Sequence, residues 1–290
     1  MSSALDGDHG LAPLGIIAGL GHLPVKVAEA ASARGQDVFI VRLKGFVEPA
    51  LESYLGTEIG IAEIGKILKA LKQAGCKDVC FAGRVTRPDF GTLKPDLKGL
   101  SLLPKVIAAA RKGDDALLRV LVETVESDGF RVIGAEQASG ALLAGAGVIL
   151  GAPPSDQCMS DIHKAAKVAA EIGRLDIGQG AIVCDGLVLC VEAQEGTDLM
   201  LQRCAQLDPK LRGDTSRRKG VLVKRPKPIQ ERRIDLPTIG PVTIEGAAAA
   251  GLAGIAVETG GALLVSIDDM KVVADRYGLF VYGFSKDLKA

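Results

Sequence analysis

The first half of the chain alternates between short apolar runs and amphipathic stretches, and this alternation constrains the fold more than any other feature. Residues 14–18 are apolar, end in a glycine turn and precede an amphipathic stretch that starts at Pro24. A strand, a turn and a helix fit that order. The pattern continues with expected strands at 37–43, 78–82 and 130–134 and expected helices at 59–74, 102–111 and 114–126. Such alternation is typical of a parallel sheet, so the sequence predicts a doubly wound domain over residues 14–147.

The chain is also long enough for a second domain. It has 290 residues, and a domain averages roughly 150. Between 140 and 160 the sequence loses its charge and gains Gly and Pro, so we expect a linker at 148–160. Residues 1–13 have the polar character of a disordered tail.

The region after the linker predicts a C-terminal mixed α/β domain over residues 161–290. It opens with an expected helix at 161–171, capped by Ser160. Apolar runs on both sides of Asp185 and Gly186 predict a β-hairpin. The fold class is therefore α/β with two domains.

Composition excludes several classes of function. Lys+Arg and Asp+Glu are both 35, aromatic residues make up 3% and Trp is absent. A chain with no net charge and few stacking side chains is poorly suited to nucleic acid, so we expect no nucleic-acid partner. No apolar stretch reaches the ~20 residues that span a bilayer, and we expect a cytoplasmic protein. The six cysteines form no CxxC pair and are expected to be buried.

The first glycine turn is a candidate phosphate site. Gly19 and Gly21 precede the first expected helix, where backbone N–H groups bind phosphate. Pro24 stands in place of the third glycine of a dinucleotide motif, and Arg42 lies near the end of the second strand where an acid would bind ribose. An NAD site is therefore disfavoured, while contact with another phosphate and a purely structural turn both stay open.

Two further loops of the first half are ambiguous. Arg84 lies after the strand at 78–82, where open α/β sheets bind ligands, and can grip an anion or face solvent. Asp114 and Asp115 can bind Mg²⁺ or simply cap the helix that follows.

Two loops flank the predicted hairpin, at 173–180 and 192–198, and combine polar side chains with glycines. Because the two ends of a hairpin are neighbours, we expect these loops to converge. Turn and cap chemistry is the alternative reading. The candidate binding residues in them are Asp176, Gln179, Gln194, Glu195, Gly196, Thr197 and Asp198.

A third segment, at 224–240, concentrates positive charge. Together with 217–219 it carries eight basic residues in a neutral protein, which suits a diphosphate, although a solvated charge run is also possible. Asp235 lies between prolines in this segment, as a metal ligand or a base for water. The other candidate binding residues here are Lys227, Gln230, Arg233 and Thr238.

Other common catalytic motifs are absent from the sequence. The three histidines show no HExxH spacing, and no GxSxG motif occurs. Zinc chemistry and Ser-His-Asp hydrolysis are therefore not expected.

Taken together, these segments resemble the I-type UDP-2,3-diacylglucosamine pyrophosphatases of lipid A biosynthesis. The resemblance covers nearly the whole chain, from about residue 14 to residue 284. The matching motifs are AGLGHLP at 18–24, KGDDALL at 112–118, GRLDIGQG at 173–180, EAQEGTD at 192–198, KPIQERRIDLPTIG at 227–240 and GLFVYGF at 278–284.

The resemblance implies a fold and a reaction. The fold is a Rossmann-like N-terminal domain joined to a distinctive C-terminal catalytic α/β domain, with the site between them, in a protein that is usually a homodimer. The reaction is Mg²⁺-dependent hydrolysis of UDP-2,3-diacylglucosamine to UMP and 2,3-diacylglucosamine 1-phosphate (lipid X), with water attacking the sugar-side phosphorus. The implied location is the cytoplasmic face of the inner membrane, with peripheral membrane contact.

The resemblance also implies residue roles. Asp235 is the residue on which catalysis depends, either as a Mg²⁺ ligand or as the group that orients water. Glu195 is a second candidate metal ligand. Two alternatives remain at this point: a non-catalytic nucleotide-sugar or lipid-binding protein, and a nicotinamide-dependent oxidoreductase.

Overall fold

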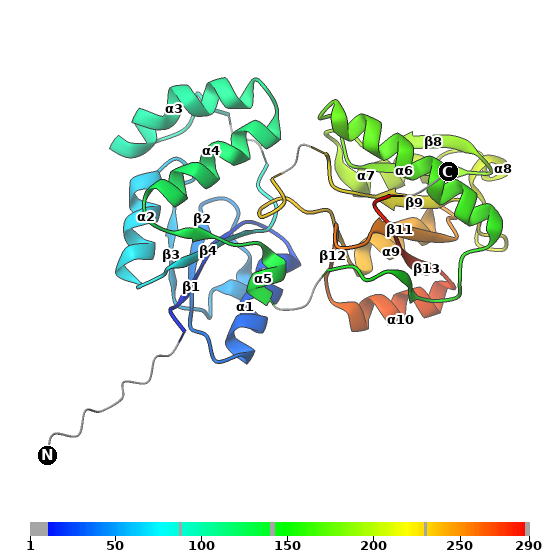
Figure 1. The fold of residues 1–290 in the computed structure, drawn as a ribbon, viewed down its shortest axis with the longest axis horizontal. Helices are drawn as coiled ribbons and strands as arrows, with labels where there is room; N and C mark the ends of the chain where they lie inside the picture. The colour runs from blue at the N-terminus through cyan, green and yellow to red at the C-terminus, as the bar shows by residue number, and fades with distance from the viewer. Residues whose placement is uncertain (1–10, 87–88, 140–142, 229–230, 288–290) are drawn as a thin grey trace, which may run out of the picture. The chain divides into compact units, whose positions relative to one another are not determined.

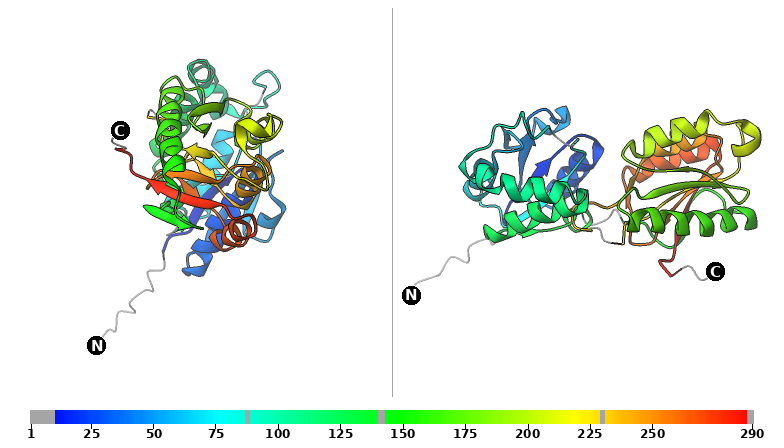
Figure 2. Two further views of the ribbon diagram at one scale, coloured as in Figure 1. Left: turned by 90° about the vertical axis from the view of Figure 1, so that its right-hand side faces the viewer. Right: turned by 90° about the horizontal axis from the view of Figure 1, so that it is seen from above.

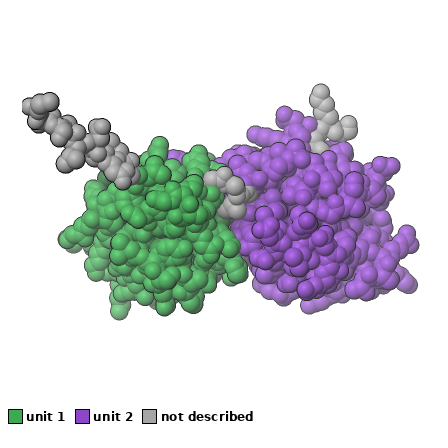
Figure 3. Space-filling model, turned by 90° about the horizontal axis from the view of Figure 1, so that it is seen from below, with its two compact units in different colours: residues 1–140 green, residues 141–290 purple. Residues whose placement is uncertain are grey.

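The computed structural model describes residues 11–86, 89–139, 143–228 and 231–287. The chain divides into two compact units, residues 1–140 and 141–290 (Figure 3). Each unit has its own sheet (Figure 1). No helix among the described residues is long and apolar enough to cross a membrane.

The first unit follows the predicted alternation of strands and helices. Its elements are β1 (Leu14–Ala18), α1 (His22–Ala33), β2 (Val38–Leu43), the 3₁₀ turn η1 (Pro49–Leu51), β3 (Gly56–Ile59), α2 (Ile64–Gln73), β4 (Asp78–Ala82), α3 (Leu97–Ala110), α4 (Asp114–Ser127), β5 (Arg131–Val132) and α5 (Ala135–Ser139).

The sheet of this unit is parallel throughout, in the order β3-β2-β1-β4-β5. Every residue of the central strand β1 is buried, as an all-apolar strand between helical layers should be. The strand order changes direction at β1, which has β2 on one side and β4 on the other. The predicted doubly wound parallel sheet is confirmed.

The strand β3 of the first unit was not predicted from the sequence. The stretch expected to be a helix at 59–74 begins with the last residue of β3, and α2 starts only at Ile64. β3 has the sequence GTEI and lies at the edge of the sheet beside β2. A short polar edge strand carries no apolar alternation, so its pattern does not separate it from the helix that follows.

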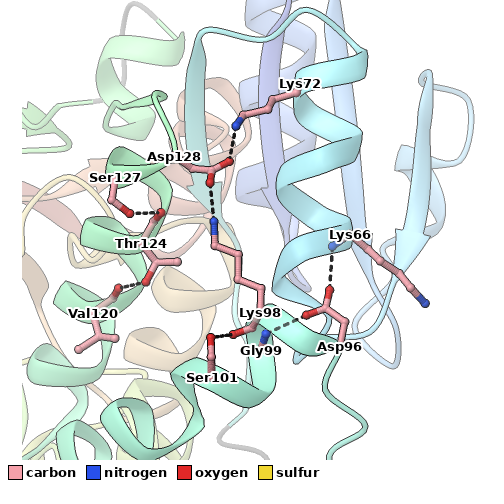
Figure 4. A network of polar contacts seen from close by, with 10 residues as sticks. All are labelled: Lys66, Lys72, Asp96, Lys98, Gly99, Ser101, Val120, Thr124, Ser127 and Asp128. Carbon is pink, nitrogen blue, oxygen red and sulfur yellow. Dashed lines mark hydrogen bonds and ion pairs between the residues drawn. The ribbon is translucent and has the colours of Figure 1, made fainter.

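Asp128 ties three helices of this unit together (Figure 4). It follows the last turn of α4, and its carboxylate binds Lys98 of α3 and Lys72 of α2, the latter at 2.7 Å. Asp96 caps α3 by accepting the N–H of Gly99 and also accepts the N–H of Lys66 in α2. These polar contacts join α3 to both α2 and the end of α4.

The second unit contains a mixed α/β fold, as predicted. Its elements are β6 (Gly147–Leu150), α6 (Asp156–Arg174), β7 (Gly180–Cys184), β8 (Leu187–Val191), α7 (Gly196–Ala205), α8 (Pro209–Arg212), β9 (Val221–Lys224), β10 (Thr238–Ile239), α9 (Pro241–Ala249), β11 (Gly254–Glu258), β12 (Leu263–Leu264), α10 (Ile267–Tyr277) and β13 (Phe280–Phe284).

The main sheet of this unit has the order β6-β13-β11-β9-β7-β8, with a small β10-β12 pair beside it. β9, β11 and β13 are parallel, whereas β6 and β7 run antiparallel to their neighbours. Alternate side chains of the sheet enter two different cores. One core faces α6, and the other faces α7, α9 and α10 (Figure 2).

The predicted hairpin is β7 and β8, joined at Asp185 and Gly186. Both turn residues have positive φ, 50° and 75°, which is the geometry of a type I′ turn. The buried carboxylate of Asp161 in α6 accepts their backbone N–H groups at 3.0 and 2.8 Å. The hairpin is therefore anchored to the helix beneath it.

The predicted linker at 148–160 forms regular structure instead. These residues supply most of β6 and the beginning of α6, and the division between the compact units falls after residue 140. The cap of α6 is Ser155, which accepts the N–H of Cys158, and not Ser160. Pro153 and Pro154 lie in the short loop between β6 and α6, which explains why composition alone suggested a linker. Residues 1–10 of the predicted tail lie outside the described residues.

Candidate functional site

Three of the polar segments meet at one edge of the C-terminal sheet, the edge at which β9 and β11 end. We call this edge the carboxyl edge, and we call the segments the first motif (173–180), the second motif (192–198) and the third motif (224–240). β7 starts there, because Gly180 pairs with Lys224 at the end of β9. β8 ends there, because the N–H of Glu192 donates to the carbonyl of Gly180 at 2.8 Å. The expected convergence of the two hairpin loops is therefore observed, and the third segment joins them.

The first and third motifs are joined by direct contacts. Lys227 Nζ lies 2.6 Å from Asp176 Oδ1, and both side chains are largely buried. The backbone N–H of Arg225 donates to the carbonyl of Gln179 at 3.0 Å. Asp176 has a φ of 56°, so this ion pair holds a residue whose backbone is in the left-handed region.

The second motif packs against the first through glycine. A Cβ on Gly178 would lie 2.0 Å from the carbonyl oxygen of Glu192. Gly196 has a φ of 76° and begins α7. Thr197, in the first turn, donates its hydroxyl to Glu192 Oε1 at 2.8 Å.

The other polar residues of the second motif lie nearer the surface. Glu195 accepts from Arg203 Nη2 at 2.7 Å, and this hydrogen bond lowers the pKa of the Glu195 carboxyl. Gln194 and Asp198 are exposed. Glu195 is therefore engaged by a cationic side chain in this structure.

The third motif forms the connection between the end of β9 and the short strand β10. The guanidinium of Arg233 binds both carboxylate oxygens of Glu231, at 2.9 and 3.0 Å. The N–H of Asp235 donates to the carbonyl of Glu231 at 3.2 Å, and Asp235 is partly buried. Thr238 starts β10 and donates to the carbonyl of Leu236. Gln230 lies outside the described residues.

A buried ion cluster lies on the α6 face of the carboxyl edge. Glu258, at the end of β11, is 1% exposed and pairs with Arg225 at 2.8 Å and Arg232 at 3.0 Å. The Arg225 guanidinium also lies over the ring of Phe284, 6.0 Å from its centroid. This cluster fixes the start of the basic segment to the sheet.

Two buried charged residues at the carboxyl edge were not among the predicted site residues. Glu192 and Lys224 are each 5% exposed. Both directly follow or end an apolar strand, and a charged residue in that place is the signal that could have identified them. They lie on the sheet face that carries α7, α9 and α10, because Cys190 and Leu222, two positions earlier, belong to that core.

The carboxyl edge does not present a complete protein cage for a metal ion. Among the described residues, no group of three or more His, Cys, Asp or Glu side chains could hold a metal. One acidic atom is nevertheless suited to a cation: Glu192 Oε2 is buried and has no hydrogen-bond partner. Mg²⁺ commonly takes one or two carboxylates from a protein and its other ligands from water and substrate phosphates, and this donor set fits that pattern.

The predicted phosphate residues of the first unit lie in two loops that contact each other. Leu20 and Arg84 exchange backbone hydrogen bonds of 3.0 and 2.8 Å, at the carboxyl ends of β1 and β4. A Cβ on Gly19 would lie 2.6 Å from the Arg84 carbonyl oxygen, so close loop packing explains this glycine. The N–H of Gly21, before α1, donates to Glu48 Oε2 at 2.9 Å. A carboxylate thus lies where an anion would approach the helix N-terminus.

The acidic pair Asp114 and Asp115 lies in the first turn of α4, after its N-cap Gly113. Asp115 Oδ2 accepts from Arg119 Nε at 2.8 Å. Negative charge in the first turn of a helix is stabilising, which is sufficient to account for both residues.

Comparisons with known proteins agree with the motifs. The family model described as the LpxI N-terminal domain matches residues 13–142, and the LpxI C-terminal domain matches residues 145–282. The chain is 54% identical over 270 residues to the UDP-2,3-diacylglucosamine pyrophosphatase LpxI of Caulobacter vibrioides, covering 93% of this chain and 96% of that protein.

The similarity to solved structures is low. A putative NAD-dependent epimerase/dehydratase from Methylobacillus flagellatus is 12% identical, with 96% of this chain and 89% of that chain covered and a TM-score of 0.31. A likeness this low carries no information about function.

Proposed function

The chain belongs to the LpxI family, and we propose that it hydrolyses the diphosphate of UDP-2,3-diacylglucosamine to UMP and 2,3-diacylglucosamine 1-phosphate. The observation that carries the proposal is the 54% identity to a pyrophosphatase of that name over 93% of this chain. The convergence of three polar motifs at the carboxyl edge supports the proposal, because a cluster of polar and charged side chains is a candidate site for binding and catalysis.

In the proposed reaction, water attacks the sugar-side phosphorus. A bond forms between the water oxygen and that phosphorus, and the bond from that phosphorus to the bridging oxygen breaks. UMP leaves with the bridging oxygen. Asp235 orients the water and accepts a proton from it, a role that suits a partly buried carboxylate in a turn braced by Glu231.

No protein nucleophile enters this scheme. The six cysteines are buried and unpaired with one another in disulfides. Burial raises the pKa of Cys80 and Cys204 to about 12 and that of Cys76 and Cys184 to about 11, so these thiols stay protonated near neutral pH. Attack by water needs only positioning and charge stabilisation.

We propose that Mg²⁺ participates, bound by Asp235 together with the substrate diphosphate. Bound in this way, Mg²⁺ would neutralise the charge that develops on the phosphoryl oxygens. Lys227 and Arg233 supply positive charge from the same segment, although each already pairs with a carboxylate. Glu195 is not used in this scheme, because Arg203 engages it.

The substrate also suggests where the enzyme works. Its two acyl chains are held by a membrane, so we propose peripheral contact with the cytoplasmic face of the inner membrane. We further propose a homodimer, as the family resemblance implies.

The test is UMP release from UDP-2,3-diacylglucosamine dispersed in detergent, with Mg²⁺ or with excess EDTA. The proposal expects release with Mg²⁺ and none with EDTA. In water enriched in ¹⁸O, the label should appear in the lipid product and not in UMP. Label in UMP would place the attack on the other phosphorus, and binding without any UMP would favour a non-catalytic binding protein.

A further inference from the structure

Two buried residues of opposite charge flank Gly180 on one face of the C-terminal sheet. Lys224 is the register partner of Gly180 on β9. Glu192 follows β8 and bonds to Gly180 on the other side. Directly opposed residues of a sheet point to the same face, and the glycine between them has no side chain to separate them.

The Glu192 carboxylate is only half satisfied. Oε1 accepts from the Thr197 hydroxyl at 2.8 Å, whereas Oε2 is buried without a hydrogen-bond partner. A Cβ on Gly180 would lie 2.4 Å from Oε2, so the carboxylate lies directly over the glycine. Burying a carboxylate oxygen without a hydrogen-bond partner costs free energy, and a ligand bound to that oxygen would reduce the cost.

The Lys224 ammonium is equally short of partners. Its one hydrogen bond among the described residues is to the carbonyl of Thr238, at 3.4 Å. An ammonium has three N–H donors, so two remain unused. The neighbouring cations differ in this respect, because Arg225 pairs with Glu258 and Lys227 pairs with Asp176.

We infer that Glu192 and Lys224 form the subsite that takes the diphosphate together with its divalent cation. Lys224 Nζ donates to phosphoryl oxygens, and Glu192 Oε2 binds the cation. The inference rests on the proposed function and deepens it. A magnesium diphosphate presents both charges at once, which matches a carboxylate and an ammonium held on one face. The Thr238 carbonyl links Lys224 to the motif that carries Asp235.

The test uses Glu192→Gln and Lys224→Met, with matched controls on exposed residues of the same unit, Glu171→Gln and Lys271→Met. The probes are Mn²⁺, followed by electron paramagnetic resonance, and UDP, followed by calorimetry. Glu192→Gln should weaken Mn²⁺ binding in the presence of UDP at least about tenfold. It should also raise the Mg²⁺ concentration for half-maximal UMP release by a similar factor.

Lys224→Met should weaken UDP binding and lower UMP release about 100-fold. Its melting temperature should not fall, because an apolar side chain replaces a buried charge that has no carboxylate partner. A purely structural lysine would behave in the opposite way, losing stability while folded protein keeps its UDP affinity.

Gly180→Ala is an independent variant, since its methyl group displaces the Glu192 carboxylate without removing it. It should reproduce the Mn²⁺ defect of Glu192→Gln. Unchanged Mn²⁺ affinity in Glu192→Gln, or unchanged UDP affinity in Lys224→Met, would overturn the inference. If the unaltered protein releases no UMP, the proposed function fails, and the Mn²⁺ and UDP arms still decide the subsite.

Discussion

Lys227 Nζ lies 2.6 Å from Asp176 Oδ1, and this ion pair joins loops that are 51 residues apart in the sequence. The side chains are only 11% and 17% exposed, so solvent screens the pair weakly. It fixes the loop before β7 against the loop after β9, at the carboxyl edge.

We therefore expect Lys227→Met and Asp176→Asn each to destabilise the second unit by about 1–3 kcal/mol. Because both remove the same contact, the double variant should cost less than the sum. Urea unfolding of the four proteins in this cycle measures the coupling. Strictly additive effects would show that the contact contributes nothing.

Gly178→Ala should be far more damaging than an ordinary glycine substitution. Its Cβ would lie 2.0 Å from the Glu192 backbone carbonyl oxygen, so a backbone must move. Gly186→Ala is the matched control, because that glycine has a φ of 75° with open space around it and should cost about 1 kcal/mol. Thermal melts of the two variants compare them, and equal losses would contradict the close approach of the two loops.

The sequence predicted the elements with strong periodicity and clear punctuation. β4 has the predicted bounds, and the Asp185–Gly186 turn has the predicted geometry, because Asp-Gly between apolar runs favours few alternatives. β3 was not predicted because an edge strand with the sequence GTEI lacks the alternation of apolar and polar residues that identifies a strand. The linker was misplaced because Gly and Pro also mark the tight loop between β6 and α6.

For the candidate site, the sequence predicted which loops converge but not which side chains contact one another. Convergence of the hairpin ends follows from local sequence. That Gly180 lies between Lys224 and Glu192 depends on the pairing of β7 with β9, which are about forty residues apart and pair through tertiary structure. Engagement of Glu195 by Arg203 similarly depends on how α7 packs beside β8.

Asp128 makes the stability of the first unit sensitive to acid. Hydrogen bonds from Lys72 and Lys98 lower its pKa below the ordinary 3.8. The folded state therefore binds this proton less readily than the unfolded state, so the stabilisation is present above about pH 4 and is lost as pH falls through the folded pKa. Asp128→Asn should cost about 1 kcal/mol at pH 7, allowing for the exposure of both lysines, and progressively less as pH falls through the folded pKa. Denaturant unfolding across this pH range provides the measurement, and a loss that does not change with pH would contradict the account.

The cysteines should be unreactive in the folded protein. All six are buried, and burial raises the pKa of Cys80 and Cys204 to about 12. A thiol reagent such as dithionitrobenzoate should label almost none in native buffer at pH 8 and all six in urea. Rapid labelling without urea, or loss of UMP release on labelling of the folded protein, would show an accessible thiol that the structure does not contain.

Asp235 is the proposed catalytic carboxylate of a diphosphate hydrolase. The most direct measurement compares UMP release by the unaltered protein and by Asp235→Asn, with Asp275→Asn on the exposed side of α10 as the matched control. Asn preserves the size of the side chain and removes its charge, so the fold should persist. We expect Mg²⁺-dependent UMP release from the unaltered protein and the control, and a loss of at least about 100-fold in Asp235→Asn. Equal UMP release by all three proteins would contradict the account.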